Sequence, residues 1–85
     1  MTQMIIELTF YTTDGCHLCK EAMQLLQQLL AEHSEQYQIE IIDIAESDAL
    51  IEQYGTRIPV LLKGSLKKDL GWPFNYQVLL NYVRL

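Results

Sequence analysis

The two cysteines of the chain stand three residues apart, in Cys16-His17-Leu18-Cys19, where a strand-like segment gives way to a helix-like one. Residues 4–11 form an apolar run rich in Ile, Phe and Tyr, and residues 12–15 are turn formers. Apolar side chains then recur at helical spacing over residues 18–30. Because a helix advances about 3.6 residues per turn, both thiols are expected on one face of its first turn, close enough to form a disulfide.

Cys16 is expected at the start of this helix, where backbone N–H groups lack partners and the helix dipole is positive. Such a position favours a thiolate over a thiol, and the thiolate is the nucleophile in thiol–disulfide exchange. Cys19, one turn deeper, is then the expected resolving thiol. The alternative is an ordinary buried cysteine, but the position at a helix start favours the catalytic interpretation.

The middle of the chain predicts a second strand and a short helix. Residues 37–44 carry isoleucines on both faces of the expected strand, which predicts burial on both sides. Residues 47–54 have the pattern of a short helix, begun by Ser47 and Asp48 and stopped by Gly55. The first two strands, joined through a helix, should be parallel.

The last third of the chain predicts a hairpin and a final helix. Residues 58–63 and 66–70 flank Gly64-Ser65, a turn of the kind that joins antiparallel strands. Pro73 suits the first turn of the last helix. Residues 1–85 are therefore expected to form a single α/β domain, ordered β-α-β-α-β-β-α, with a four-stranded mixed sheet flanked by helices.

Size and charge narrow the expected function. The chain has 85 residues, 49% of them hydrophobic, which fits one compact core. Its formal net charge is −5 and its six Lys and Arg residues are scattered, so we expect no nucleic-acid partner. No apolar stretch approaches the roughly 20 residues of a membrane span and no signal peptide is recognisable, so we expect no membrane partner and a cytoplasmic location. In that reducing compartment a Cys-x-x-Cys pair is more often catalytic or metal-binding than structural.

The element order, Cys16-His17-Leu18-Cys19 and Arg57-Ile58-Pro59-Val60 together resemble the glutaredoxin branch of the thioredoxin-like fold, over essentially the whole chain. With Trp72-Pro73-Phe74, the pattern looks like a small group of bacterial glutaredoxin-like proteins. The resemblance implies that Pro59 is cis and that its loop faces the cysteines. It also implies that the Ile58 backbone is free to pair with the main chain of a thiol substrate.

Three departures from the glutaredoxin pattern concern the substrate. His17 and Leu18 stand where dithiol glutaredoxins commonly have Pro and an aromatic residue. Thr13 replaces a Lys that meets a glutathione carboxylate in many members. The glycine-and-aspartate turn that receives the γ-glutamyl end of glutathione is replaced by residues 71–75, which hold no carboxylate. The resemblance therefore implies the family more strongly than it implies glutathione dependence.

Three further residues are candidates around the cysteines. Arg57 directly precedes Ile58-Pro59, and its guanidinium can fork onto a substrate carboxylate, or its stem can simply cover apolar surface. Trp72 either packs in the core or offers an apolar contact to a protein disulfide. His17 either tunes the thiolate or is an ordinary solvated side chain.

The leading hypothesis is a dithiol thiol–disulfide oxidoreductase, with Cys16 attacking a disulfide or glutathione mixed disulfide and Cys19 resolving it. It requires no bound cofactor or metal, uses glutathione as a possible co-substrate, takes a disulfide-containing protein or glutathione as partner, and is expected to be a monomer. Two alternatives stay open. One is a metal- or iron–sulfur-binding module using Cys16, although a single Cys-x-x-Cys is a weak zinc signal. The other is a non-catalytic redox-sensing adaptor.

Overall fold

The computed structural model describes residues 5–64 and 66–85, so Met4 and Ser65, which the sequence assigns to the first strand and the hairpin turn, lie outside the described residues. The elements are β1 (Ile6–Thr12), α1 (His17–His33), β2 (Tyr37–Asp43), the short 3₁₀ helix η1 (Ile44–Glu46), α2 (Asp48–Tyr54), β3 (Val60–Lys63), β4 (Leu70–Gly71) and α3 (Tyr76–Val83). The predicted order is therefore confirmed. No helix among these residues combines the length and the apolar character that crossing a bilayer requires.

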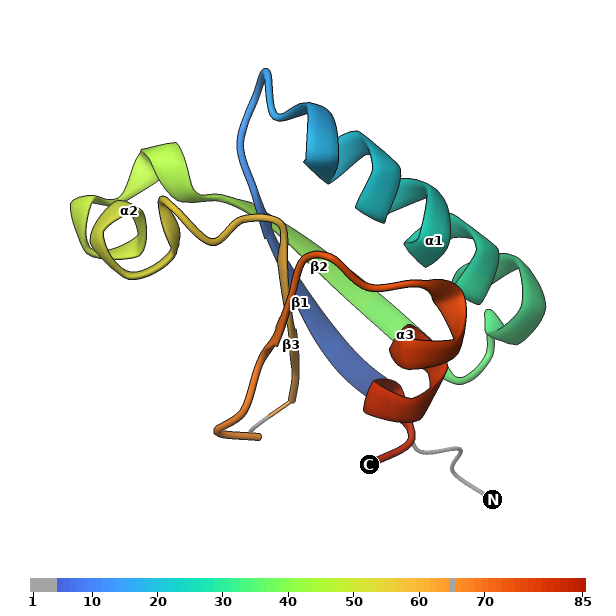
Figure 1. Ribbon diagram of the computed structural model, residues 1–85. Coiled ribbons are helices and arrows are strands. Elements are labelled where there is room, and N and C mark those ends of the chain that lie inside the picture. Colours follow the sequence, from blue (N-terminus) through green and yellow to red (C-terminus); the bar gives the residue numbers. More distant parts are fainter. Residues whose placement is uncertain (1–4, 65) are drawn as a thin grey trace.

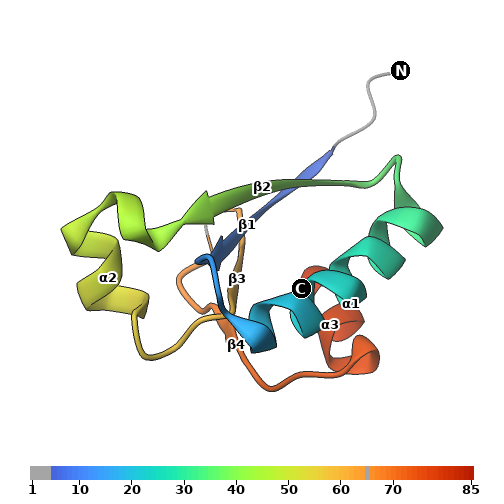
Figure 2. The ribbon, with the colours of Figure 1, turned by 90° about the horizontal axis from the view of Figure 1, so that it is seen from above.

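The four strands form one mixed sheet in the order β2-β1-β3-β4. Strand β1 pairs in parallel with β2 and antiparallel with β3, and β3 pairs antiparallel with β4. Helices α1 and α3 lie on the same side of the sheet (Figure 1), whereas α2 lies past the carboxyl end of β2 (Figure 2). This is the mixed four-stranded α/β architecture that the sequence predicts.

The main core lies between the sheet and helices α1 and α3. Alternation along β1 turns Leu8 and Phe10 to this side, and both are buried. The apolar stripe of α1 meets them, as its helical spacing predicts. Each fully buried Leu or Phe contributes roughly 1.5–3 kcal/mol, so this layer holds the end of β1 and the start of α1 together. The buried residues of α1 are Cys19, Ala22, Leu26 and Leu29.

Strand β2 is an edge strand, so the expected burial on both of its faces is wrong. It pairs only with β1 among the described strands. Ile41 lies opposite Phe10 in the register, yet it is 57% exposed because none of the described elements covers that end of β2. A run of isoleucines identifies a strand, but it does not distinguish an edge strand from a central one.

The β3–β4 hairpin has a shorter ladder than the sequence predicts. Its expected Gly64-Ser65 turn falls partly outside the described residues, and the Leu66 N–H donates a hydrogen bond to the Lys63 carbonyl across it (2.9 Å). The β3–β4 ladder contains only Val60 opposite Gly71 and Leu61 opposite Leu70. Further along, the buried Tyr82 hydroxyl accepts a hydrogen bond from the Lys63 N–H (3.0 Å) and donates one to the Lys68 carbonyl (2.7 Å). The hydroxyl thus bridges the main chain at the end of β3 and the main chain before β4.

The last helix begins later than expected. Its N-cap is Asn75, whose side chain accepts a hydrogen bond from the Val78 N–H (2.9 Å), so Pro73 lies before the helix and not in its first turn. Asparagine is among the preferred N-cap residues, and this bond satisfies a backbone donor that the helix leaves unpaired. The predicted limits of the short helix are confirmed, because Ser47 caps the start of α2 and Gly55 its end.

Candidate functional site

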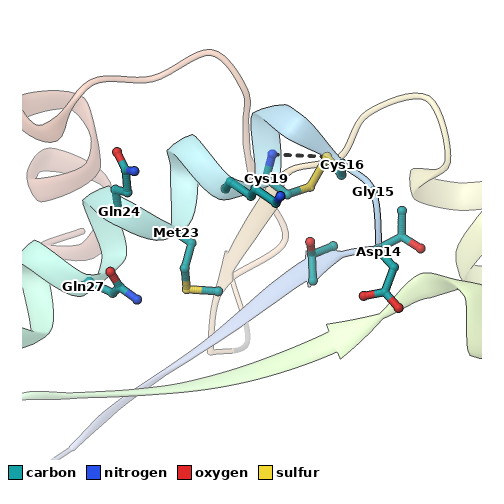
Figure 3. Close-up of a pocket in the computed structure, with 10 residues that line it drawn as sticks. Asp14, Gly15, Cys16, Cys19, Met23, Gln24 and Gln27 are labelled. Atoms are coloured by element: carbon teal, nitrogen blue, oxygen red, sulfur yellow. Dashed lines mark hydrogen bonds between the residues drawn. A yellow bond between two sulfur atoms is a disulfide. The ribbon is translucent and has the colours of Figure 1, made fainter.

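The cysteine pair lies at the start of α1. Gly15 turns the chain with a φ of +81°, a conformation that glycine adopts without strain, and Cys16 follows as the N-cap residue in an extended conformation. The Cys19 backbone N–H donates a hydrogen bond to Cys16 Sγ (3.1 Å), the dashed line in Figure 3. Cys16 and Cys19 form a disulfide, with their Cα atoms 5.2 Å apart. The Cys16 sulfur thus takes the place of the oxygen that usually caps a helix.

The two sulfurs differ in accessibility. Cys16 is half-buried, whereas only 4% of Cys19 is exposed and it belongs to the main core. An incoming sulfur atom therefore reaches Cys16 before Cys19. His17 and Leu18, between the cysteines, are exposed, Leu18 to 45%. Next to the disulfide the surface thus offers one imidazole and one apolar side chain.

The segment before β3 is held by its own backbone hydrogen bonds. The Ile58–Pro59 peptide is cis, and the Pro59 carbonyl accepts a bond from the Trp72 N–H (3.2 Å). The Ile58 N–H donates to the Tyr54 carbonyl (3.0 Å). The expectation of a fully free Ile58 backbone is therefore wrong for the N–H group. The Ile58 carbonyl accepts no hydrogen bond from the residues that the structure describes.

Arg57 already holds a carboxylate, that of Asp69. Its Nη1 and Nη2 donate to Oδ2 (3.1 Å) and Oδ1 (2.5 Å), and its guanidinium lies 5.8 Å from the centre of the Tyr54 ring. The hydrogen bonds that Arg57 donates to Asp69 raise the pKa of Arg57. Neither interpretation of Arg57 from the sequence included this partner, because Asp69 lies twelve residues away in a loop that the sequence assigned to a strand.

Trp72 is partly buried and packs with its edge toward Phe74, with ring centres 5.0 Å apart. Cys16, Ile58 and Trp72 all pack against the same core cluster. The structure thus packs three of the candidate residues against the main core. Trp72 has a packing role there, and part of its side chain stays accessible. Tyr11 and Asp43, also near strand ends, have local roles: Tyr11 stacks on Tyr54, and Asp43 caps η1.

A groove of about 300 Å³ adjoins the disulfide (Figure 3). Neither Arg57, Ile58 nor Trp72 lines it, and sequence reasoning missed it. The helical spacing of Cys16, Lys20, Met23 and Gln27, which share one face of α1, is the signal that could have revealed it. The residues that line the groove are Thr12, Thr13, Asp14, Gly15, Cys16, Cys19, Lys20, Met23, Gln24 and Gln27.

The described residues offer little support for the alternative of a metal-binding module. Within residues 5–64 and 66–85, no group of three or more His, Cys, Asp or Glu side chains is arranged to hold a metal ion. His33, near the end of α1, instead meets the edge of the Tyr37 ring at a centre-to-centre distance of 6.2 Å. A Cys-x-x-Cys pair alone supplies two of the four ligands that zinc prefers.

Comparison with known proteins relates the chain to a described family. The sequence model of the family "Glutaredoxin-like domain (DUF836)" matches residues 7–84. Among curated proteins, none matches the chain. Of the solved structures, protein XcR50 from X. campestris is 32% identical, with a TM-score of 0.75; the match covers 91% of this chain and 95% of that one.

Two further solved structures are similar. Protein Ne2328 from Nitrosomonas europaea is 28% identical, with a TM-score of 0.75, and the match covers 96% of this chain and 95% of that one. The germline-specific thioredoxin protein Deadhead from Drosophila melanogaster is 19% identical, with a TM-score of 0.67, and the match covers 94% of this chain and 79% of that one. The last likeness concerns the fold alone, which is thioredoxin-like as the sequence predicts.

Proposed function

Because the chain belongs to the family of glutaredoxin-like domains, we propose that it is a dithiol thiol–disulfide oxidoreductase whose reacting atoms are the sulfurs of Cys16 and Cys19. In the reduced protein the Cys16 thiolate attacks one sulfur of a substrate disulfide and expels the other as a thiolate. Cys19, as thiolate, then attacks Cys16 Sγ, forms the internal disulfide and releases the second substrate thiol. Two electrons pass to the substrate, and a thiol donor returns them by the reverse exchange.

The observation that carries this proposal is the hydrogen bond from the Cys19 N–H to Cys16 Sγ at the start of α1. A backbone donor and the positive end of a helix dipole both favour negative charge on that sulfur. The partial exposure of Cys16 and the burial of Cys19 support the same order of attack and resolution. His17, exposed beside Cys16, is proposed to tune the thiolate.

On the substrate side, we propose that the Ile58 carbonyl and the accessible part of Trp72 contact the bound thiol, with Pro59 shaping the segment between them. The partner is a disulfide-containing protein or glutathione, and no bound cofactor is required. Either glutathione or a protein reductase then supplies the electrons. The expectations of a cytoplasmic monomer without nucleic-acid or membrane partners complete the proposal.

The test is a reductase assay on metal-free protein with two substrates, insulin and a glutathione mixed disulfide. Turnover of either substrate supports the oxidoreductase. Absence of turnover together with a metal that copurifies at a fixed ratio would favour the metal-binding module. Absence of both would favour the redox-sensing adaptor.

A further inference from the structure

The groove beside the disulfide is lined by neither Ile58 nor Trp72. Both cysteines line it, together with the loop of residues 12–15 and one face of α1. Figure 3 shows Met23 and Gln27 reaching from α1 toward the strands, while Asp14 lies at the other end of the groove, next to Gly15. A substrate joined to Cys16 through its sulfur therefore lies next to this groove.

The lining of the groove is chemically mixed and carries no net charge. Asp14 and Lys20 contribute one charge of each sign, and Gln24 and Gln27 contribute amides that can both donate and accept hydrogen bonds. Met23 packs against the main core and supplies an adaptable apolar surface between them. An anionic small thiol gains little from such a surface, because Asp14 offsets Lys20 and the whole chain carries a net charge of −5.

A polypeptide matches this lining better. Its main chain is neutral and presents an N–H and a C=O at every residue, which glutamine and threonine side chains can pair with. It also extends in both directions from a half-cystine, whereas a small thiol occupies one side only. The volume of about 300 Å³ lies at the lower end of the usual range for binding pockets, so the groove holds a short stretch of chain.

We propose that this groove binds the polypeptide segment adjoining the half-cystine that Cys16 captures, so that the oxidoreductase is adapted to protein disulfides. The inference rests on the proposed function and assigns Gln27 as a residue that sets substrate preference. Gln27 is exposed and its side chain lines the groove beyond Met23, so a charge introduced there changes the groove without disturbing the core.

The experiment uses charge variants of Gln27 and two disulfide-containing peptides that are identical except for the residues beside their cysteines. One peptide carries lysines there and the other carries glutamates. The variants are Gln27→Glu and Gln27→Lys. The matched controls are Gln28→Glu and Gln28→Lys, because Gln28 is the same residue type on the same helix, is exposed, and does not line the groove. Bis(2-hydroxyethyl) disulfide, which is neutral and too small to fill the groove, reports the basal reaction.

Gln27→Glu is expected to shift the ratio of kcat/KM values toward the lysine peptide, and Gln27→Lys toward the glutamate peptide, by roughly two- to fivefold each. The Gln28 variants should leave that ratio unchanged, as should all variants for turnover of the small disulfide. Equal ratios at positions 27 and 28, with the small disulfide still reduced, would overturn the groove assignment alone. Failure of the unmodified protein to reduce the small disulfide and both peptides would overturn the proposed function and the groove assignment together.

Discussion

The guanidinium of Arg57 forks onto the carboxylate of Asp69, with both of its terminal nitrogens engaged. Arg57 directly precedes the Ile58–Pro59 peptide, and Asp69 lies just before β4, so the pair joins the segments on either side of the short β3–β4 ladder. The Arg57 side chain is 45% exposed, and exposed pairs of this kind contribute only about 0.2–1 kcal/mol. The pair therefore matters more for where Arg57 points than for global stability.

With Asp69 bound, the Nη1–Nη2 edge of the Arg57 guanidinium is already occupied by a carboxylate. Asp69→Asn removes the competing charge while keeping the shape of the side chain. We expect this variant to lower the KM for a glutathione mixed disulfide severalfold and to leave the KM for bis(2-hydroxyethyl) disulfide unchanged, as steady-state kinetics would show. If the KM values for both substrates stay the same, Arg57 has a positioning role only.

The two cysteines should give opposite signatures when each is replaced. Cys16→Ser removes the accessible sulfur and is expected to abolish turnover. Cys19→Ser leaves the attacking sulfur in place but removes the group that releases the substrate, so a mixed disulfide should accumulate. Mass spectrometry of each variant after incubation with a protein disulfide measures this. Full reductase activity in Cys16→Ser would show that the assignment of the attacking thiol is wrong.

The buried Tyr82 hydroxyl should contribute measurably to stability. Tyr82→Phe leaves the Lys63 N–H and the Lys68 carbonyl without their partner. Both hydrogen bonds are part-buried, and each such bond contributes about 0.5–1.5 kcal/mol, so we expect the free energy of unfolding to fall by about 1–3 kcal/mol in urea titrations. Tyr76→Phe is the matched control, since the Tyr76 hydroxyl donates to the exposed Glu32 carboxylate. Equal losses of unfolding free energy in both variants would show that the Tyr82 hydrogen bonds stabilise the fold no more than the exposed Tyr76 hydrogen bond does.

Features set by neighbouring residues were predictable from the sequence. The sulfur of Cys16 and the hydroxyl of Ser47 each bond to a backbone N–H three residues further along, and Gly55 ends its helix locally. Turns and helix caps of this kind depend on the local residues themselves. The sequence could therefore predict the strand–helix junction that carries the cysteines, and also the limits of α2.

Features set by distant residues could not be predicted in the same way. The main chain before β4 is held by a hydroxyl from α3, fourteen residues beyond Lys68. The orientation of Arg57 depends on Asp69. Ile41 is exposed because β2 is the edge strand of the described sheet, which its own sequence does not indicate. The groove needs α1 and the preceding loop at their final separation, which local patterns do not specify. The errors therefore fall where tertiary contacts decide the outcome.

Stability should fall in alkaline solution because of three tyrosines. Burial is the main cause that raises the pKa of Tyr54, Tyr76 and Tyr82 from the ordinary value of 10.0. In each case the unfolded chain loses its phenolic proton at a lower pH than the folded one does. The resulting stabilisation is complete below the unfolded pKa and is lost as the pH rises through the folded pKa.

The urea midpoint is therefore expected to decrease steadily above about pH 10, where unfolded tyrosines ionise. Tyr82→Phe should begin from a lower midpoint and lose less with increasing pH, because one of the three titrating groups is absent. A series of unfolding curves at closely spaced pH values measures both slopes. Parallel slopes in the two proteins would exclude Tyr82 as a source of the alkaline sensitivity, and a constant midpoint in the unmodified protein would exclude all three tyrosines.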